Sequence, residues 1–198
     1  KQSWNVDSVA QILQNDNLTR PFIVVGINNH PEGRLFDYMP RKALDYIAKD
    51  DTLLAKYDMN MFVADNYLRF IVEELKPFID KNYSTSPERG STFIAGSSMG
   101  GLISMYAICE YPHIFGGAAC LSTHSPLVIT DAPAEVPVWA KAFRDYLNDN
   151  LPTPNSAHIY MDCGDRTIDA GYIPLQMQIN ELFKAKGWGV AHFRCKLF

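Results

Sequence analysis

Short apolar runs alternate with stretches of helical periodicity along most of this chain. Apolar runs predict strands over residues 21–27, 92–95, 116–121, 158–161 and 190–198. Apolar positions at helical spacing predict helices over residues 6–13, 65–79, 102–109, 138–147 and 174–186. The alternation runs without an internal repeat or an obvious linker, so residues 1–198 are predicted to be a single α/β domain with a largely parallel sheet.

The pattern of apolar and polar residues is clearer in some segments than in others. The run Pro21–Ile27 is continuous and rich in β-branched residues, which predicts a central strand covered on both faces. The last nine residues alternate between apolar and polar, which predicts a half-buried strand near a sheet edge. In the first helix, Asp7 is the expected N-cap, and the residues on the expected inner face are Val6, Val9, Ile12 and Leu13. Residues 41–60 and 126–137 show little periodicity and are expected to be loops.

The clearest chemical signal lies between the second predicted strand and its helix. Gly96-Ser97-Ser98-Met99-Gly100 is a G-x-S-x-G sequence, which in this context makes a sharp strand-to-helix turn. Gly96 and Gly100 are expected to avoid clashes that a Cβ atom would cause. The turn predicts strained backbone at Ser98, with the hydroxyl raised above the sheet. The Met99 N–H is then free to point at a developing oxyanion.

The residues Ile94–Leu102 resemble the nucleophile elbow of the "Putative esterase" family of α/β-hydrolases, which includes feruloyl esterases, enterochelin-type esterases and the esterase D group. Further similarities are Gly26-Ile27 at a strand end, then Arg34, and then Tyr38-Met39-Pro40. The segment entering the elbow strand is similar as well. The resemblance covers the chain from about Trp4 to the end, and it implies the α/β-hydrolase fold, with a mostly parallel central sheet flanked by helices.

A serine nucleophile requires a histidine base and an acid that orients it, in the chain order Ser, acid, His for this fold. The loop after the strand at 158–161 supplies two candidate acids, Asp165 and Asp169. In the feruloyl-esterase relatives a Gln follows the catalytic Asp by seven residues, and Gln176 has that spacing from Asp169. The resemblance therefore favours Asp169, with Asp165 as the alternative.

The histidine is harder to place. Only His192 follows Asp169, and it is expected at the opposite end of the sheet from Ser98. The family's catalytic His lies in a loop after the last strand, so the base is expected outside these 198 residues. The family also has strands before the segment that begins here. We therefore expect a partial domain, truncated at both ends, whose unpaired strand edge permits a homo-oligomer.

Other loop residues are predicted to line the substrate pocket. His30 and Arg34 follow the strand predicted at 21–27, and His124 follows the strand at 116–121. All three are therefore expected at the carboxyl edge of the sheet, where open α/β sheets bind ligands. We interpret His30, Arg34 and His124 as candidate substrate-binding residues.

Composition limits the remaining possibilities. The formal net charge of −4 argues against non-specific nucleic-acid binding, and no apolar run reaches the ~20 residues of a membrane helix. The four cysteines lack C-x-x-C spacing, so buried free thiols are expected rather than a metal or redox site. No cofactor is expected. Localisation stays open between cytoplasmic and secreted or periplasmic.

These observations predict a serine hydrolase that cleaves a small-molecule or carbohydrate-linked carboxylic ester through an acyl-enzyme on Ser98. Two alternatives remain at this level. An acyltransferase of the same fold would pass the acyl group to an acceptor other than water. A non-catalytic ligand-binding member would keep the fold alone, although the intact Gly96-x-Ser98-x-Gly100 argues against it.

Overall fold

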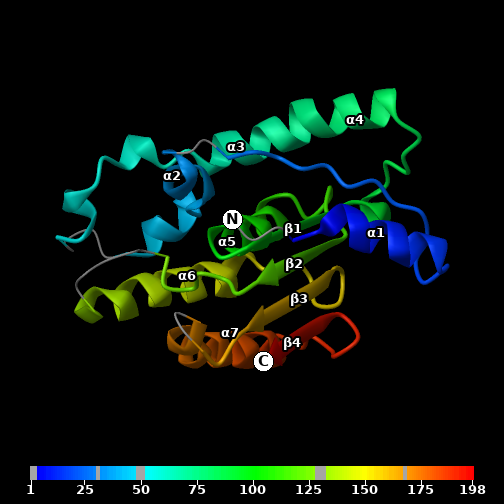
Figure 1. Ribbon diagram of the computed structural model, residues 1–198. Helices are drawn as coiled ribbons and strands as arrows, with labels where there is room; N and C mark the ends of the chain where they lie inside the picture. Colours follow the sequence, from blue (N-terminus) through cyan, green and yellow to red (C-terminus); the bar gives the residue numbers. More distant parts are fainter. Residues whose placement is uncertain (1–3, 30–31, 48–51, 128–132, 167–168) are drawn as a thin grey trace.

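The computed structural model describes residues 4–29, 32–47, 52–127, 133–166 and 169–198. Within them lies a four-stranded, all-parallel sheet in the order β1-β2-β3-β4 (Figure 1). The strands are β1 (Phe93–Ser97), β2 (Gly117–Leu121), β3 (His158–Cys163) and β4 (Phe193–Leu197). The α-helices are α1 (Val6–Asn15), α2 (Arg34–Tyr38), α3 (Ala64–Phe70), α4 (Lys76–Asn82), α5 (Met99–Glu110), α6 (Val136–Asn150) and α7 (Ile173–Ala185).

The sheet has one well-packed face. Helix α5 packs along β1 and β2, and α7 packs along β4. Alternate residues of the inner strands are buried in the same core as α5, among them Cys120, Ile159 and Met161. Every residue of α5 from Met99 to Cys109 is buried, which is why this helix is apolar all round rather than amphipathic. The opposite face is more open and lines a shallow cavity of about 350 Å³ that includes Ala119 and Tyr160.

The helix predicted over 65–79 is present and runs from Ala64 to Asn82. Its middle turn, Ile71–Leu75, has π-helical hydrogen bonding between α3 and α4. Pro77 is the second residue of α4, two positions after that turn ends. Because proline has no N–H, the usual i to i−4 bond is absent there, and a local π turn is one way for a helix to accommodate the change.

The segment predicted to be loop at 41–60 contains short 3-10 turns, Arg41–Tyr46, Leu54–Lys56 and Met59–Met61. The expected loop 126–137 lies partly outside the described residues. A 3-10 turn covers Pro133–Glu135, and α6 begins at Val136, earlier than the predicted start.

The prediction of a central strand at 21–27 is wrong. No strand covers these residues, the sheet begins at β1, and the described part of the chain has four strands rather than five. The side chains of Phe22, Ile23, Val24 and Val25 are 40–52% exposed. A high content of β-branched residues indicates that a segment suits a pleated, half-buried surface. It does not indicate whether a neighbouring strand is present to pair with that segment.

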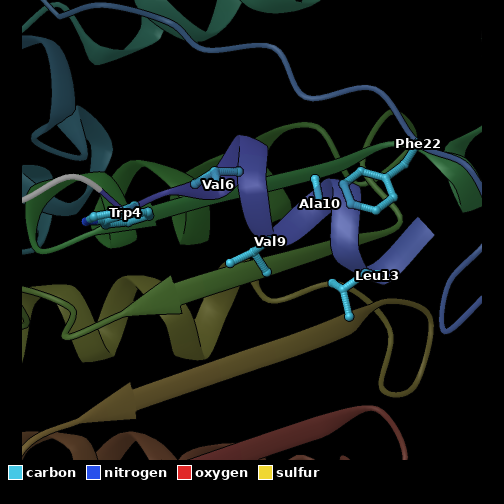
Figure 2. A pocket seen from close by; sticks show the side chains of 6 residues that line it. All are labelled: Trp4, Val6, Val9, Ala10, Leu13 and Phe22. Carbon is cyan, nitrogen blue, oxygen red and sulfur yellow. The ribbon is translucent and has the colours of Figure 1, made fainter. Parts of the chain in front are cut away.

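The first helix forms where it was predicted, but two details differ. Its N-cap is Asn5 in the left-handed region, and Asp7 lies in the first turn instead, where its charge favours the positive end of the helix dipole. Of the helix residues only Ala10 is buried. Figure 2 shows that Val9 and Leu13 line a cavity of about 540 Å³ together with Trp4, Val6, Ala10 and Phe22. The predicted inner face is therefore only partly covered.

Two glycines of the turn after β1 differ in what they allow. A Cβ atom on Gly96 would lie 2.5 Å from the carbonyl carbon and oxygen of Gly100, whereas a Cβ atom on Gly100 would meet nothing within 4 Å beyond its own helix. The predicted clash therefore applies to Gly96 and is wrong for Gly100. The next residue, Gly101, lies against Thr123, with 2.6 Å from its would-be Cβ to the hydroxyl oxygen.

This contrast predicts a matched pair of variants. We expect Gly96→Ala to lower the free energy of unfolding by about 1–3 kcal/mol or more, the cost of a typical overpacked site. The added Cβ atom would meet the backbone of Gly100, which cannot move aside as a side chain can. Gly100→Ala should be neutral or slightly stabilising, since alanine favours helix. Urea unfolding of both variants measures this. Equal midpoints for Gly96→Ala and Gly100→Ala would contradict the described turn.

Candidate active site

Ser98 has the backbone of a strained turn residue. Its φ is 58° and its ψ is −118°, and it is the N-cap of α5. Non-glycine residues rarely occupy such conformations, and they persist only where the surrounding structure enforces them. Ser98 is partly exposed, at the carboxyl end of β1. The strained backbone expected at Ser98 from the sequence is therefore confirmed.

The end of β2 fixes this turn from both sides. The Ser98 N–H donates to the Leu121 carbonyl at 2.9 Å, and the Ser98 carbonyl accepts from the His124 N–H at 3.3 Å. Met99 follows as the first residue of α5. The N–H groups of a helix's first turn have no partner within the helix. The Met99 N–H therefore has no partner within α5, and its role toward an oxyanion stays a prediction.

The two candidate acids lie in different surroundings. The Asp165 side chain is 65% exposed and lies 3.7 Å from the Arg166 guanidinium. Asp169 is half-buried, and its Oδ2 accepts from the Ser122 hydroxyl at 2.7 Å and from the Gly164 N–H at 3.2 Å. Ser122 directly follows β2 at the edge that carries Ser98. This placement supports Asp169 over Asp165.

His124 connects the loop after β2 to the loop that carries Asp169. It is buried, and its Nδ1 lies 2.7 Å from the hydroxyl of Tyr172, whose ring meets it edge to face. Tyr172 ends the 3-10 turn Asp169–Tyr172. Burial raises the pKa of Tyr172, and the Asp169 carboxylate raises it further.

Together these contacts close a ring around the turn. Ser98 bonds to Leu121, the adjacent Ser122 bonds to Asp169, Asp169 shares a turn with Tyr172, and Tyr172 contacts His124, which bonds back to Ser98. The sequence pattern singled out neither Ser122 nor Tyr172. Ser122 directly follows a predicted strand, at the carboxyl edge of the sheet. This position is the feature of the sequence that could have pointed to Ser122.

Arg34 lies beside the turn. Its Nη2 donates to the Ser97 carbonyl at 3.2 Å, and its guanidinium carbon is 5.9 Å from the centre of the Tyr38 ring. Ser97 directly precedes Ser98, so this hydrogen bond places the Arg34 guanidinium next to the turn. His30 lies outside the described residues. The substrate-binding roles of His30, Arg34 and His124 stay predictions.

His192 lies where the sequence placed it, just before β4 and therefore at the amino edge of the parallel sheet. Its ring stacks on His158 with 4.7 Å between centroids, and its Nδ1 is 3.3 Å from the Ala157 carbonyl. Ser98 directly follows β1 at the opposite edge. This geometry separates His192 from the candidate nucleophile.

The cysteines are free thiols, as predicted. Cys109, Cys120 and Cys163 are buried, and Cys195 is partly exposed. Burial raises the pKa of Cys163 to about 11, so it remains a neutral thiol at physiological pH. Among the described residues no group of three or more His, Cys, Asp or Glu side chains is placed to hold a metal ion. No helix in the described ranges is long and apolar enough to span a membrane.

The sequence profile of the family described as "Putative esterase" matches residues 4–187. The chain belongs to this family. The fold is similar to that in the crystal structure of an IroE-like serine hydrolase from Shewanella oneidensis, which superposes with a TM-score of 0.56 at 20% identity, over 87% of this chain and 52% of that one. The predicted α/β-hydrolase fold, with its parallel sheet and flanking helices, is confirmed.

Two curated relatives of this esterase family member are similar in sequence. The "Uncharacterized protein YbbA" of Bacillus subtilis (strain 168) is 25% identical over 172 residues, which is 84% of this chain and 60% of the relative. The "Endo-1,4-beta-xylanase/feruloyl esterase" of Xylanibacter ruminicola is 35% identical over 138 residues, 67% of this chain and 16% of the relative. The chain thus spans less than two thirds of either relative's length.

Proposed function

We propose that this chain carries the nucleophile and the acid of a serine hydrolase that cleaves a carboxylic ester. The observation that supports the proposal most is the backbone of Ser98, held at positive φ between β1 and α5. In a family of esterases, this is the conformation that raises a serine hydroxyl above the sheet.

The proposed chemistry has two stages. Ser98 Oγ attacks the ester carbonyl while a histidine base removes its proton, and the Met99 N–H stabilises the oxyanion. The tetrahedral intermediate collapses to an acyl-enzyme as the alcohol leaves with a proton from the imidazolium. Water then attacks the acyl carbonyl and releases the acid. Asp169 orients the histidine in both stages. Its hydrogen bonds with the Ser122 hydroxyl and the Gly164 N–H hold the carboxylate beside the turn that carries Ser98.

The base is assigned to none of the four described histidines. His158 and His192 lie at the amino edge of the sheet, and the Nδ1 of His124 faces Tyr172. His113 lies in the turn after α5. We propose that the base is the histidine that the family places after its last strand.

The substrate class proposed is a small-molecule or carbohydrate-linked ester. The name of the Xylanibacter relative includes feruloyl esterase, and this supports an ester as the substrate. Nucleic acid is not proposed as a partner, because the chain has a formal net charge of −4.

A direct test compares the natural protein with its His192→Gln variant on p-nitrophenyl acetate and methyl ferulate. We expect measurable turnover of the activated ester and an unchanged kcat in His192→Gln, because this ring lies at the far edge of the sheet. Absence of turnover on both esters would contradict ester hydrolysis. A loss of orders of magnitude in His192→Gln would show that the base lies within this chain.

A further inference from the structure

Ser122 occupies an unusual position between two carboxylates. It directly follows β2, and its φ of 40° places it in the left-handed region that favours glycine. Its N–H donates to Asp162 Oδ1 at 2.8 Å, and its hydroxyl donates to Asp169 Oδ2 at 2.7 Å. One residue thus connects the end of β2 to the end of β3 and to the loop after it.

The contacts use only one oxygen of Asp169. Oδ2 accepts from both the Ser122 hydroxyl and the Gly164 N–H, while Oδ1 accepts no hydrogen bond from the described residues. An acid that orients a histidine needs one oxygen free for the imidazole N–H and a fixed carboxylate plane. The arrangement provides both.

The backbone of Ser122 supports the same interpretation. A serine at positive φ costs more than a glycine would, and such strain is found where the local structure requires it. The hydrogen bond to Asp162 holds the N–H, and the adjacent Leu121 carbonyl accepts from Ser98. The direction of the Ser122 hydroxyl is therefore linked to the turn that carries the proposed nucleophile.

We propose that Ser122 is a positioning residue for ester hydrolysis: its hydroxyl holds the Asp169 carboxylate so that Oδ1 faces the histidine base. The inference rests on the proposed function. Ser122 contacts no reacting atom and acts through Asp169 alone. Its removal should therefore lower kcat and leave KM nearly unchanged.

Two variants distinguish the effect of losing the Ser122 hydroxyl from the effect of relieving its strained backbone. Ser122→Gly removes the hydroxyl and relieves the positive φ, whereas Ser122→Ala removes the hydroxyl and keeps the strain. We expect both to lower kcat on p-nitrophenyl acetate by the same factor, roughly 10–100-fold, as when other partners that orient a functional side chain are lost. Their melting temperatures should differ, with Ser122→Gly the higher.

A matched control is available in the same loop. The Ser125 hydroxyl donates to the Thr123 carbonyl at 3.3 Å, and among the described residues it bonds to no carboxylate. We expect Ser125→Ala to keep the kcat of the natural protein. The inference would be overturned if the loss of kcat ran parallel to the loss of melting temperature across Ser122→Gly, Ser122→Ala and Ser125→Ala. Such a correlation would mean that kcat reflects stability alone.

The decisive readout is a double-mutant cycle in the natural protein. Once Asp169 is alanine, Ser122 has no carboxylate to hold, so Ser122→Gly should cause no further loss of kcat in the Asp169→Ala background. An additive loss would overturn the inference. Wild-type kcat in Ser122→Gly, with turnover lost in Ser98→Ala, would overturn the inference but leave the proposed function standing. Full turnover in Ser98→Ala would overturn both.

Discussion

Replacing Ser98 with alanine is expected to lower kcat for p-nitrophenyl acetate in the natural protein by about 10⁶-fold, the loss that follows removal of a serine nucleophile. In the proposed mechanism the hydroxyl is the group that forms the acyl-enzyme, and alanine has no group that can replace it. Alanine preserves the N-cap backbone and the size of the turn. Steady-state kinetics with a melting curve on the same sample separate lost chemistry from lost folding.

The adjacent serine is the matched control. Ser97 belongs to β1, and its carbonyl accepts from Arg34, an interaction that a side-chain change leaves in place. We expect Ser97→Ala to retain most of the turnover. Equal kcat in Ser98→Ala and the natural protein would show that the nucleophile lies elsewhere. Loss in Ser97→Ala alone would move the assignment by one residue.

Replacing Asp169 with asparagine is expected to lower kcat by roughly 10⁴-fold, the effect of the equivalent change in a serine-protease triad. The amide keeps the shape of the side chain but cannot stabilise the imidazolium or fix the required tautomer. The hydroxyl of Ser122 can still reach the amide oxygen, so the fold should be retained. The measurement is kcat on an activated ester at a pH where the natural protein is fully active.

Asp165→Asn serves as the control for this prediction. Its side chain is 65% exposed and forms an ion pair with Arg166 at 3.7 Å, and exposed pairs of this kind contribute about 0–1 kcal/mol. We expect kcat to stay within a factor of two or three of the natural value. The reverse result, with loss in Asp165→Asn and retention in Asp169→Asn, would make Asp165 the acid.

The nucleophile turn was predictable from sequence because its cause is local. Gly96 must lack a Cβ atom to let Gly100 approach, and the strand and helix on either side are patterned within a few residues. The apolar run at 21–27 shows the opposite case. Its pattern is that of a buried strand, but strand formation depends on a partner whose position the pattern does not contain.

The supporting contacts of the site depend on the fold as a whole. Ser122 and Asp169 are 47 positions apart, and His124 and Tyr172 are 48 apart. Each pair meets only because parallel strands place their carboxyl ends at one edge of the sheet. The sequence could nominate Asp169 through its similarity to known esterases. The hydroxyl that binds the Asp169 carboxylate is that of Ser122, and it could be identified only from the pairing of β2 with β3 in the structure.

The central claim, that Ser98 is an activated nucleophile, is tested most directly by its covalent chemistry. The natural protein would be treated with a fluorophosphonate and digested, and the modified peptide sequenced by mass spectrometry. The account predicts a single phosphonyl adduct on Ser98 that is absent from Ser98→Ala and retained in Ser97→Ala. An adduct that persists in Ser98→Ala, or one that maps to another residue, would contradict it.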